Sequence, residues 1–505
     1  MSLLNSLGLN ETDKEAEASD FSSVRRNLLM GGLFAGLFAF KDADAQGHGD
    51  LPYDPTLNWV SPELRLARRI TFGLTAAEAA LAKRLGYDAY LERHLNYTRI
   101  NDGRCESIAR RLFPIAFMNS RDVAQKDYWE IYTHTAGAYL YRSVNSKRQL
   151  YHRMVEFWTD HFNIFFEKDG VHWLLPAHYR DAIQQHAMTT FPQLLRAVCG
   201  SPGMLEYLDN APNSGEQPNI NFARELLELH TMGVDGGYTR ADIYGVARSF
   251  TGWSYEWDDN NRKKGRFIFR PDYHDFEEKS VLGNTIPAGR GIEDGQQVID
   301  ILVNHPSTAR FISKKLIKRF LRPDPTDEMI TQVAAVYTST GGDIKAMLRA
   351  ILSQENILET PAKYKRPYHL AVSVMRSWTA SLSNYPHILE HIYLIGQAPF
   401  LWSPPDGYPD KIEFWAGLIL PRWDFGLELF SWGIDGISMN LRRLWRRKTL
   451  AEEVVQIIEA NMFAGEMDPL ERAELVAFLD VDPLSEERRR ATVALALCSP
   501  NYQWY

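Results

Sequence analysis

Cysteine is scarce in this chain, with only Cys105, Cys199 and Cys498 among 505 residues. Three thiols allow at most one disulfide and leave one thiol over. No Cys-x-x-Cys or Cys-x-x-Cys-His motif occurs, which excludes iron–sulfur clusters, thiolate zinc sites and covalently attached c-type haem. A packed core must therefore stabilise the fold, and a hydrophobic content of 45% is sufficient to build one.

Several catalytic and binding motifs are also missing. The chain has no G-x-S-x-G elbow, no Walker loop, no dinucleotide-binding G-x-G-x-x-G and no H-E-x-x-H zinc motif. The formal net charge is −8, so the basic surface that binds duplex nucleic acid is not expected either. These absences disfavour the standard nucleotide-dependent, serine-hydrolase and zinc-protease mechanisms, and they disfavour nucleic acid as a partner.

The N-terminus carries the three parts of an export signal. Residues 22–30 read SSVRRNLLM, an apolar stretch follows over 28–40, and residues 43–45 form the small-x-small site that signal peptidase cuts. The adjacent pair Arg25 and Arg26 favours the twin-arginine route over the ordinary secretory route. That route generally carries folded proteins, which leaves room for a cofactor acquired before export.

The apolar stretch of this signal contains 13 residues. Crossing a bilayer takes about 20, so cleavage is favoured over membrane anchoring. We expect residues 1–45 to be removed as a twin-arginine-type signal peptide. Residues 46–505 would then act in the periplasm or outside the cell, without stable insertion into a membrane.

Beyond the signal, the hydrophobic periodicity is helical. Thr75 and Glu78 form a capping box that opens a helix through Leu85, and Gly86 ends it. The same kind of pattern predicts further helices along the chain. These cover residues 122–142, 146–166, 176–190, 191–200, 219–232, 240–252, 305–320, 326–338, 342–354, 366–382, 448–463, 468–479 and 485–498.

Strand-like alternation is rare. Residues 266–270 and 279–283 show it best and predict a small β-hairpin near residues 265–283. No period of 20–50 residues repeats, which argues against a solenoid. We therefore predict a mainly α fold over residues 46–505, a large single-domain multi-helix array with a small β-hairpin excursion.

The amino-acid sequences of several segments resemble those of a known family. The longest segment, residues 219–253, reads NINFARELLELHTMGVDGGYTRADIYGVARSFTGW. FWTDHF precedes it at 157–162 and SPGMLEYLDN at 201–210, while PPDGYP follows at 404–409. In this order the segments resemble the DUF1800 family of bacterial proteins, most clearly over residues 64–432. The resemblance implies an exported helical protein without a settled activity, and a DUF1501-like companion protein as its partner.

His161 is the first candidate for chemistry. It lies about 40° from Phe157 on the helix, and therefore on the apolar face. A buried histidine there could be a metal ligand or a general base with a pKa lowered by burial. The alternative is a core histidine bonded to a backbone carbonyl or a carboxylate. On the opposite face, residues four apart are expected to pair along the helix, namely His152, Glu156 and Asp160.

Glu225 and Glu228 are the second candidates. They lie three residues apart on one helix, so both carboxylates share a face about 60° wide. Helical proteins build divalent-metal sites from such carboxylates together with histidines of facing helices. Arg224 lies one turn before Glu228 and could instead neutralise it, which makes a structural salt bridge the alternative.

The remaining candidates are polar or aromatic residues in or beside the predicted loops: Asp209, Asn210, Asn221, Trp253, His274, Asp406 and Tyr408. Loops on a rigid scaffold are where binding sites usually form. Asp and Asn also occur in loops simply because they make turns, and a tryptophan can pack in the core instead of stacking on a sugar.

Two main hypotheses follow. In the first, an exported enzyme of hydrolytic type acts on a surface or secreted polymer, with Glu225 or Glu228 as acid/base or metal ligand, and His161 as ligand or base. His274 would add a ligand from a loop, a divalent metal would be the cofactor, and the loop residues would bind substrate. In the second, a non-catalytic scaffold binds the DUF1501-like protein, and arginines such as Arg224 and Arg248 neutralise the carboxylates. A redox protein with a non-covalent cofactor is a third option.

Overall fold

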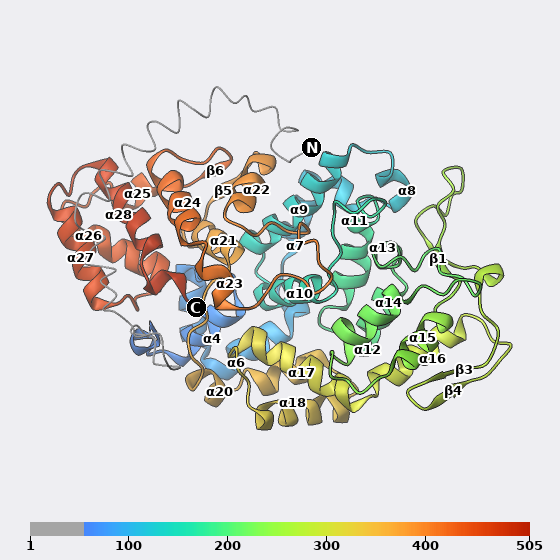
Figure 1. Cartoon of the computed structure of the whole chain (residues 1–505). Coiled ribbons are helices and arrows are strands. Elements are labelled where there is room, and N and C mark those ends of the chain that lie inside the picture. The colour runs from blue at the N-terminus through green and yellow to red at the C-terminus, as the bar shows by residue number, and fades with distance from the viewer. Residues whose placement is uncertain (1–54) are drawn as a thin grey trace.

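The computed structural model of the chain describes residues 55–505 (Figure 1). The mainly α fold is confirmed, because helices dominate the described chain and its strands form only small two-stranded sheets. Within residues 55–505, none of the helices combines the length and hydrophobicity needed to cross a bilayer. The predicted export signal lies outside the described residues, and export stays a prediction.

The first third of the described chain contains short helices followed by two long ones. Its elements are η1 (Pro55–Asn58), α4 (Pro62–Ile70), α5 (Ala76–Leu85), α6 (Tyr87–Leu95), η2 (Tyr97–Arg99), α7 (Gly103–Leu112), η3 (Pro114–Phe117), α8 (Ser120–Val123), α9 (Tyr128–Asn145), α10 (Gln149–His161), α11 (Leu175–Ala177), η4 (His178–Gln184) and α12 (Phe191–Cys199).

The middle of the chain adds two hairpins and the most distinctive motif. Its elements are α13 (Pro202–Tyr207), α14 (Ile220–Glu225), η5 (Leu226–Thr231), α15 (Arg240–Ser249), β1 (Trp253–Tyr255), β2 (Phe267–Phe269), η6 (Pro271–Tyr273), β3 (Lys279–Val281), β4 (Asn284–Ile286), α16 (Glu293–Val303), α17 (Pro306–Phe320), α18 (Asp327–Thr340), α19 (Ile344–Ile351) and α20 (Gln354–Leu358).

The last part returns to helices, with one small sheet. Its elements are α21 (Pro367–Ser377), β5 (Ser381–Leu382), α22 (Tyr385–Leu394), α23 (Ile412–Ala416), α24 (Ile419–Ser431), β6 (Ile437–Ser438), α25 (Leu441–Trp445), α26 (Ala451–Ile458), η7 (Glu459–Phe463), α27 (Pro469–Asp480), α28 (Glu486–Cys498) and η8 (Asn501–Gln503).

Helix boundaries follow local capping chemistry where the sequence shows it. The Thr75 side chain accepts a hydrogen bond from the Glu78 amide, and Gly86 follows the end of α5 with a φ of 75°. Asn119 and Asp127 cap two separate helices, α8 and α9, where a single helix over 122–142 was predicted. The predicted helix start was wrong because the Asp127 side chain accepts hydrogen bonds from two backbone amides and so begins a new helix.

The strands form where alternation predicted them, but they pair differently. β2 pairs with β1 rather than with β3, in a register that opposes Trp253 to Phe269. β3 pairs with β4 in a second hairpin, which opposes Lys279 to Ile286. β1 was not predicted, because its three residues are all buried and therefore show no alternation of polar and apolar side chains.

The buried hydrophobic residues form one contiguous cluster that extends from Leu64 to Tyr502. All three cysteines are buried and free. Figure 1 shows helices α25–α28 at one end of the molecule and the hairpins β1–β4 at the other, with α10 and α14 between them. The predicted site residues therefore lie mainly in the central part of the fold.

Candidate functional site

The helix that carries Glu225 and Glu228 changes its winding between them. Asn219 caps α14, since its side chain accepts a hydrogen bond from the Asn221 amide. From Leu226 onward the chain forms the π-helix η5, in which the Thr231 hydroxyl donates to the Leu226 carbonyl at 2.6 Å. π-Helical turns are rare and are often found at functional sites. Glu225 ends α14, and Glu228 lies inside η5.

Glu225, Glu228 and Asp406 form what we call the acidic centre. Burial raises the pKa of Glu225 above its ordinary value, and the neighbouring Glu228 and Asp406 raise it further, while Arg224 opposes them. Among the ion pairs of residues 55–505, the alternative salt bridge between Arg224 and Glu228 does not occur. None of the three carboxylates makes an ion pair with a residue in the described part of the chain. Glu225 thus lies within electrostatic reach of two other carboxylates.

Asp406 reaches this centre on the proline-rich turn 404–409. The turn lies directly on the end of α10, because a Cβ on Gly407 would lie 2.0 Å from the Asp160 carbonyl oxygen, and Gly407 has a φ of +74°. The Asn163 amide donates to the carbonyls of Trp402 and Pro404 at 2.8 Å each. The position of Asp406 is therefore set by tight backbone contacts.

Two tyrosines border the acidic centre and were not predicted from the sequence. Burial, followed by Asp406 and Glu225, raises the pKa of Tyr207 above its ordinary value. Burial and the neighbouring Glu228 raise the pKa of Tyr238 to about 12. The Tyr207 hydroxyl donates to the Ser403 carbonyl at 2.5 Å, which ties α13 to the proline-rich turn. Both hydroxyls remain protonated donors at neutral pH.

Lys315 on α17 is a third functional residue that was not predicted from the sequence. Burial lowers the pKa of Lys315 to about 8, although Asp160 and Asp406 act in the opposite direction. A signal for it existed: Lys315 and Arg319 lie four residues apart on α17, in line with Phe311. Arg319 binds Glu156 on α10, and the half-buried Lys315 lies within electrostatic reach of Asp160 and Asp406.

His161 lies where its apolar helix face predicted, buried against Phe157 and Phe162. Its Nε2 donates to the His230 carbonyl at 3.0 Å, which leaves Nδ1 without a hydrogen-bond partner among the described residues. Burial, with Lys315 and His230 nearby, holds the pKa of His161 well below its ordinary value. The ring is therefore neutral, with one nitrogen held by backbone and the other unused.

The predicted pairing of Glu156 and Asp160 along α10 is wrong. Both carboxylates instead bind side chains from distant segments: Glu156 meets Arg319 at 2.6 Å and His369 at 2.6 Å, and Asp160 meets Arg366 at 2.5 Å. Although burial alone would raise it, these partners hold the pKa of Glu156 well below its ordinary value. The sequence pattern could not show this, because the partners lie more than 150 residues away along the chain.

The loop residues Asp209, Asn210 and Asn221 hold their own loop together. Asp209 has a φ of 59° and accepts from Lys168 at 2.6 Å and from the Asn221 amide at 3.1 Å. Asn210 is buried and donates to the carbonyls of Phe250 and Trp253. These contacts fix the segment that leads into α14, and they give all three residues a positioning role.

Trp253 and His274 lie with the hairpins. Trp253 is buried, and a Cβ on Gly295 would lie 2.7 Å from its ring, so it packs in the core. His274 contacts the Thr251 carbonyl at 2.8 Å through Nδ1 and lies 3.4 Å from Asp294 through Nε2. These partners of His274 do not belong to the acidic centre. Tyr408, in the proline-rich turn, donates to the Ala398 carbonyl at 2.8 Å.

A different group of residues has the spacing of metal ligands. Asp102, Glu106 and His152 offer ligand atoms that lie within 4.8 Å of one another. Arg142 already binds both carboxylate oxygens of Glu106 at 2.9 Å. Within residues 55–505, the predicted ligands at the acidic centre and at His274 do not form such a group, so metal binding there stays a prediction.

Comparison with protein families assigns most of the chain. The model of a family described as "Protein of unknown function (DUF1800)" matches residues 65–504. This match extends through the C-terminal helices, beyond residue 432 where the sequence motifs become less distinctive. Neither the curated proteins nor the solved structures give a match.

Proposed function

The chain belongs to the DUF1800 family, and we propose that it is an exported acid–base enzyme of hydrolytic type that acts on a surface or secreted polymer. Export rests on the twin-arginine signal in residues 1–45. The chemistry rests on the acidic centre and Lys315. Metal is not required by this proposal, although the carboxylates are suitable ligands for a divalent ion.

One observation carries the proposal. Elsewhere in the described chain, buried carboxylates such as Glu156 and Asp294 bind arginine, lysine or histidine side chains. Glu225 and Glu228 are half-buried, Asp406 is exposed, and none of the three has such a partner among the described residues. The raised pKa of Glu225 shows that its charged form is disfavoured in this environment, which is typical of functional sites. A scaffold in which arginines neutralise the carboxylates predicts the opposite arrangement.

The environments of Glu225 and Lys315 suit opposite roles. A carboxyl with a raised pKa keeps a proton that it can donate to the leaving oxygen of a scissile bond. An amine with a pKa of about 8 is uncharged in a fraction of molecules, and can accept a proton from the attacking water. Asp406 acts on both groups, and Glu228 maintains the raised pKa of Glu225. The Tyr238 hydroxyl is a donor for polar groups of the substrate, whereas the Tyr207 hydroxyl already donates to the Ser403 carbonyl.

The test uses the mature protein and the extracellular polymer fraction of its native host. We expect the wild type to release soluble fragments, and Glu225→Gln to lower the rate by about 10²–10⁴-fold because the proton donor is lost. Glu216→Gln, which changes an exposed glutamate just before α14, is the matched control and should keep the wild-type rate.

Equal rates for the wild type and Glu225→Gln would reject the acid–base role. If the wild type releases no fragments and instead co-purifies with a DUF1501-like protein, the scaffold hypothesis replaces the enzyme. The observation in its favour is the contact between the His161 ring and the His230 carbonyl, which is typical of a core histidine.

A further inference from the structure

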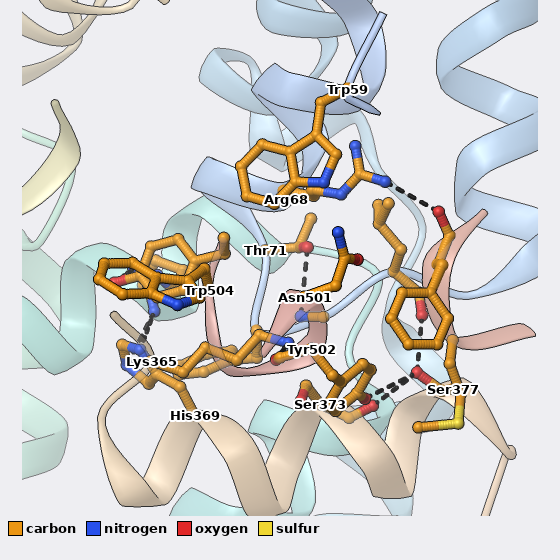
Figure 2. A pocket seen from close by; sticks show the side chains of 17 residues that line it. Trp59, Arg68, Thr71, Lys365, His369, Ser373, Ser377, Asn501, Tyr502 and Trp504 are labelled. Carbon is orange, nitrogen blue, oxygen red and sulfur yellow. Dashed lines mark hydrogen bonds between the residues drawn. The ribbon is translucent and has the colours of Figure 1, made fainter. Parts of the chain in front are cut away.

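A cavity separate from the acidic centre lies where the C-terminal segment covers α4 and α21 (Figure 2). Its volume is about 30 Å³. The side chains that line it come from both ends of the chain and from the middle, including Trp59, Arg68, Arg153, Lys365, Asn501 and Tyr502. Since one water needs roughly 10–15 Å³ of such space, the cavity accommodates only a very small ligand.

The charges around this cavity do not balance. Its lining contains three cationic side chains, those of Arg68, Arg153 and Lys365, and no aspartate or glutamate. Arg68 is bound by Glu466 at 2.6 Å, from outside the lining. Arg153 has Glu156 at 3.7 Å. Arg68 therefore has a counter-ion, and Arg153 shares Glu156 with Arg319.

Lys365 has no such counter-ion within the described chain, although only 8% of the residue is exposed. Its Nζ donates to the Tyr502 carbonyl at 2.6 Å and lies 3.6 Å from the centre of the Tyr502 ring. An ammonium carries three protons, so two of them remain without an acceptor in these contacts. Burial, with Arg68 and Arg422 nearby, lowers the pKa of Lys365 well below its ordinary value when no anion is bound.

Further donors at the cavity are unused. The Asn501 side-chain amide nitrogen is buried and has no hydrogen-bond partner, and the same holds for Arg153 Nε. In Figure 2 the side chains of Arg68, Thr71 and Asn501 lie on one side of the cavity, opposite those of Lys365 and Tyr502. Buried donors without acceptors are costly, and here they surround the same small space.

We propose that this cavity binds a small inorganic anion of the size of chloride, held mainly by Lys365 and the side-chain amide of Asn501. The bound anion favours the protonated form of Lys365 and supplies the acceptor that these donors lack. Because Lys365 precedes α21 and Asn501 begins η8, the bound anion links the C-terminal segment to the centre of the fold. The site is independent of the proposed enzymatic activity.

The experiment measures the thermal unfolding of the mature protein in sodium chloride and in sodium gluconate at equal ionic strength. We expect chloride to raise the Tm by about 2–5 °C, because an anion bound only by the folded state stabilises it. Lys365→Met should lose this difference. Lys314→Met, the same change at an exposed position, should retain it.

Asn501→Leu keeps the size of the side chain and removes one donor, so it should weaken the apparent chloride affinity about tenfold. Crystals grown in bromide should show one anomalous peak beside Lys365. The proposal is overturned if wild-type Tm is equal in the two salts, if Lys365→Met and the wild type respond equally, or if bromide is absent from the cavity. The crystallographic result decides the matter even if Lys365→Met does not fold.

Discussion

At the scale of single residues, the described chain treats buried carboxylates in two ways. Glu156 binds an arginine and a histidine from distant helices. Glu225 is half-buried beside other carboxylates and receives no ion pair from the described residues. Sequence spacing identified Glu225 and Glu228 as neighbours, but only the fold reveals which carboxylates have partners, because those partners come from elsewhere in the chain.

Arg319→Met should be strongly destabilising, by about 3–5 kcal/mol, since it leaves Glu156 buried beside an apolar side chain. The matched control is Arg310→Met on the same helix, whose partner Asp327 is exposed, and there the loss should be about 0–1 kcal/mol. Chemical unfolding of the two variants measures the difference. Equal losses would show that the network around Glu156 contributes no more than a surface pair.

Glu225 should also affect how stability depends on pH. Because its pKa is raised in the folded protein, its contribution to stability is greatest below the ordinary value of 4.5 and is lost as the pH rises through the raised pKa. Glu225→Gln removes that loss, so the variant should gain stability relative to wild type as the pH rises from below the ordinary pKa of 4.5 to above it. Unfolding midpoints across this range test it, with Glu216→Gln as the control. A constant difference between variant and wild type would contradict the prediction.

At the scale of elements, the sequence predicted the helix ends that depend only on residues close to one another in the chain. The Thr75 side chain caps α5 as predicted, while the Glu78 carboxylate contacts Tyr90 and His94 instead of completing the box. Thr239 and Asp242 form a full capping box at α15. The change from α14 to the π-helix η5 was not visible, because it depends on the fit of η5 against α16 and α17 rather than on helix propensity. The predicted pairing of the strands was wrong for a related reason. A strand of three residues has too short a hydrophobic pattern to specify its partner.

Gly407 in the proline-rich turn provides a prediction at this scale. Gly407→Ala combines a left-handed backbone with a Cβ that would collide with the Asp160 carbonyl, and should cost about 2–5 kcal/mol. Gly433→Ala has a φ of +89° but open space around the new Cβ, and should cost only about 1–2 kcal/mol. Denaturant unfolding gives both values.

The same substitution tests whether the turn positions Asp406. Gly407→Ala should also reduce fragment release, while Gly433→Ala should leave it near the wild-type rate. If both variants lose equal stability and equal activity, the close contact between the turn and α10 has no special role in the site.

At the scale of the whole molecule, the candidate site is assembled from segments far apart in the chain. His161 on α10, Glu225 on α14, Lys315 on α17 and Asp406 on the proline-rich turn span nearly 250 residues. The sequence indicated three of the four, because each lies in a distinctive motif. Lys315 was not predicted as a site residue, because a lysine on an amphipathic helix is usually exposed to solvent. Resemblance to a family identified the chain but supplied no chemistry for the site.

Export concerns the whole chain as well. Replacing Arg25 and Arg26 together by lysine should block transport, because the twin-arginine route depends on that pair. Pulse labelling and fractionation of the native host would then find the uncleaved precursor in the cytoplasm. Normal export of the double variant would show that another route carries the protein.

The central claim is that Glu225 retains its proton beyond the ordinary range because Glu228 and Asp406 lie beside it. The most direct measurement is the titration of the Glu225 carboxyl carbon by NMR in the mature protein, assigned through Glu225→Gln. The predicted pKa lies above 4.5 in the wild type and moves back toward that value in Glu228→Gln. A pKa at or below 4.5, or one that Glu228→Gln leaves unchanged, would contradict the account.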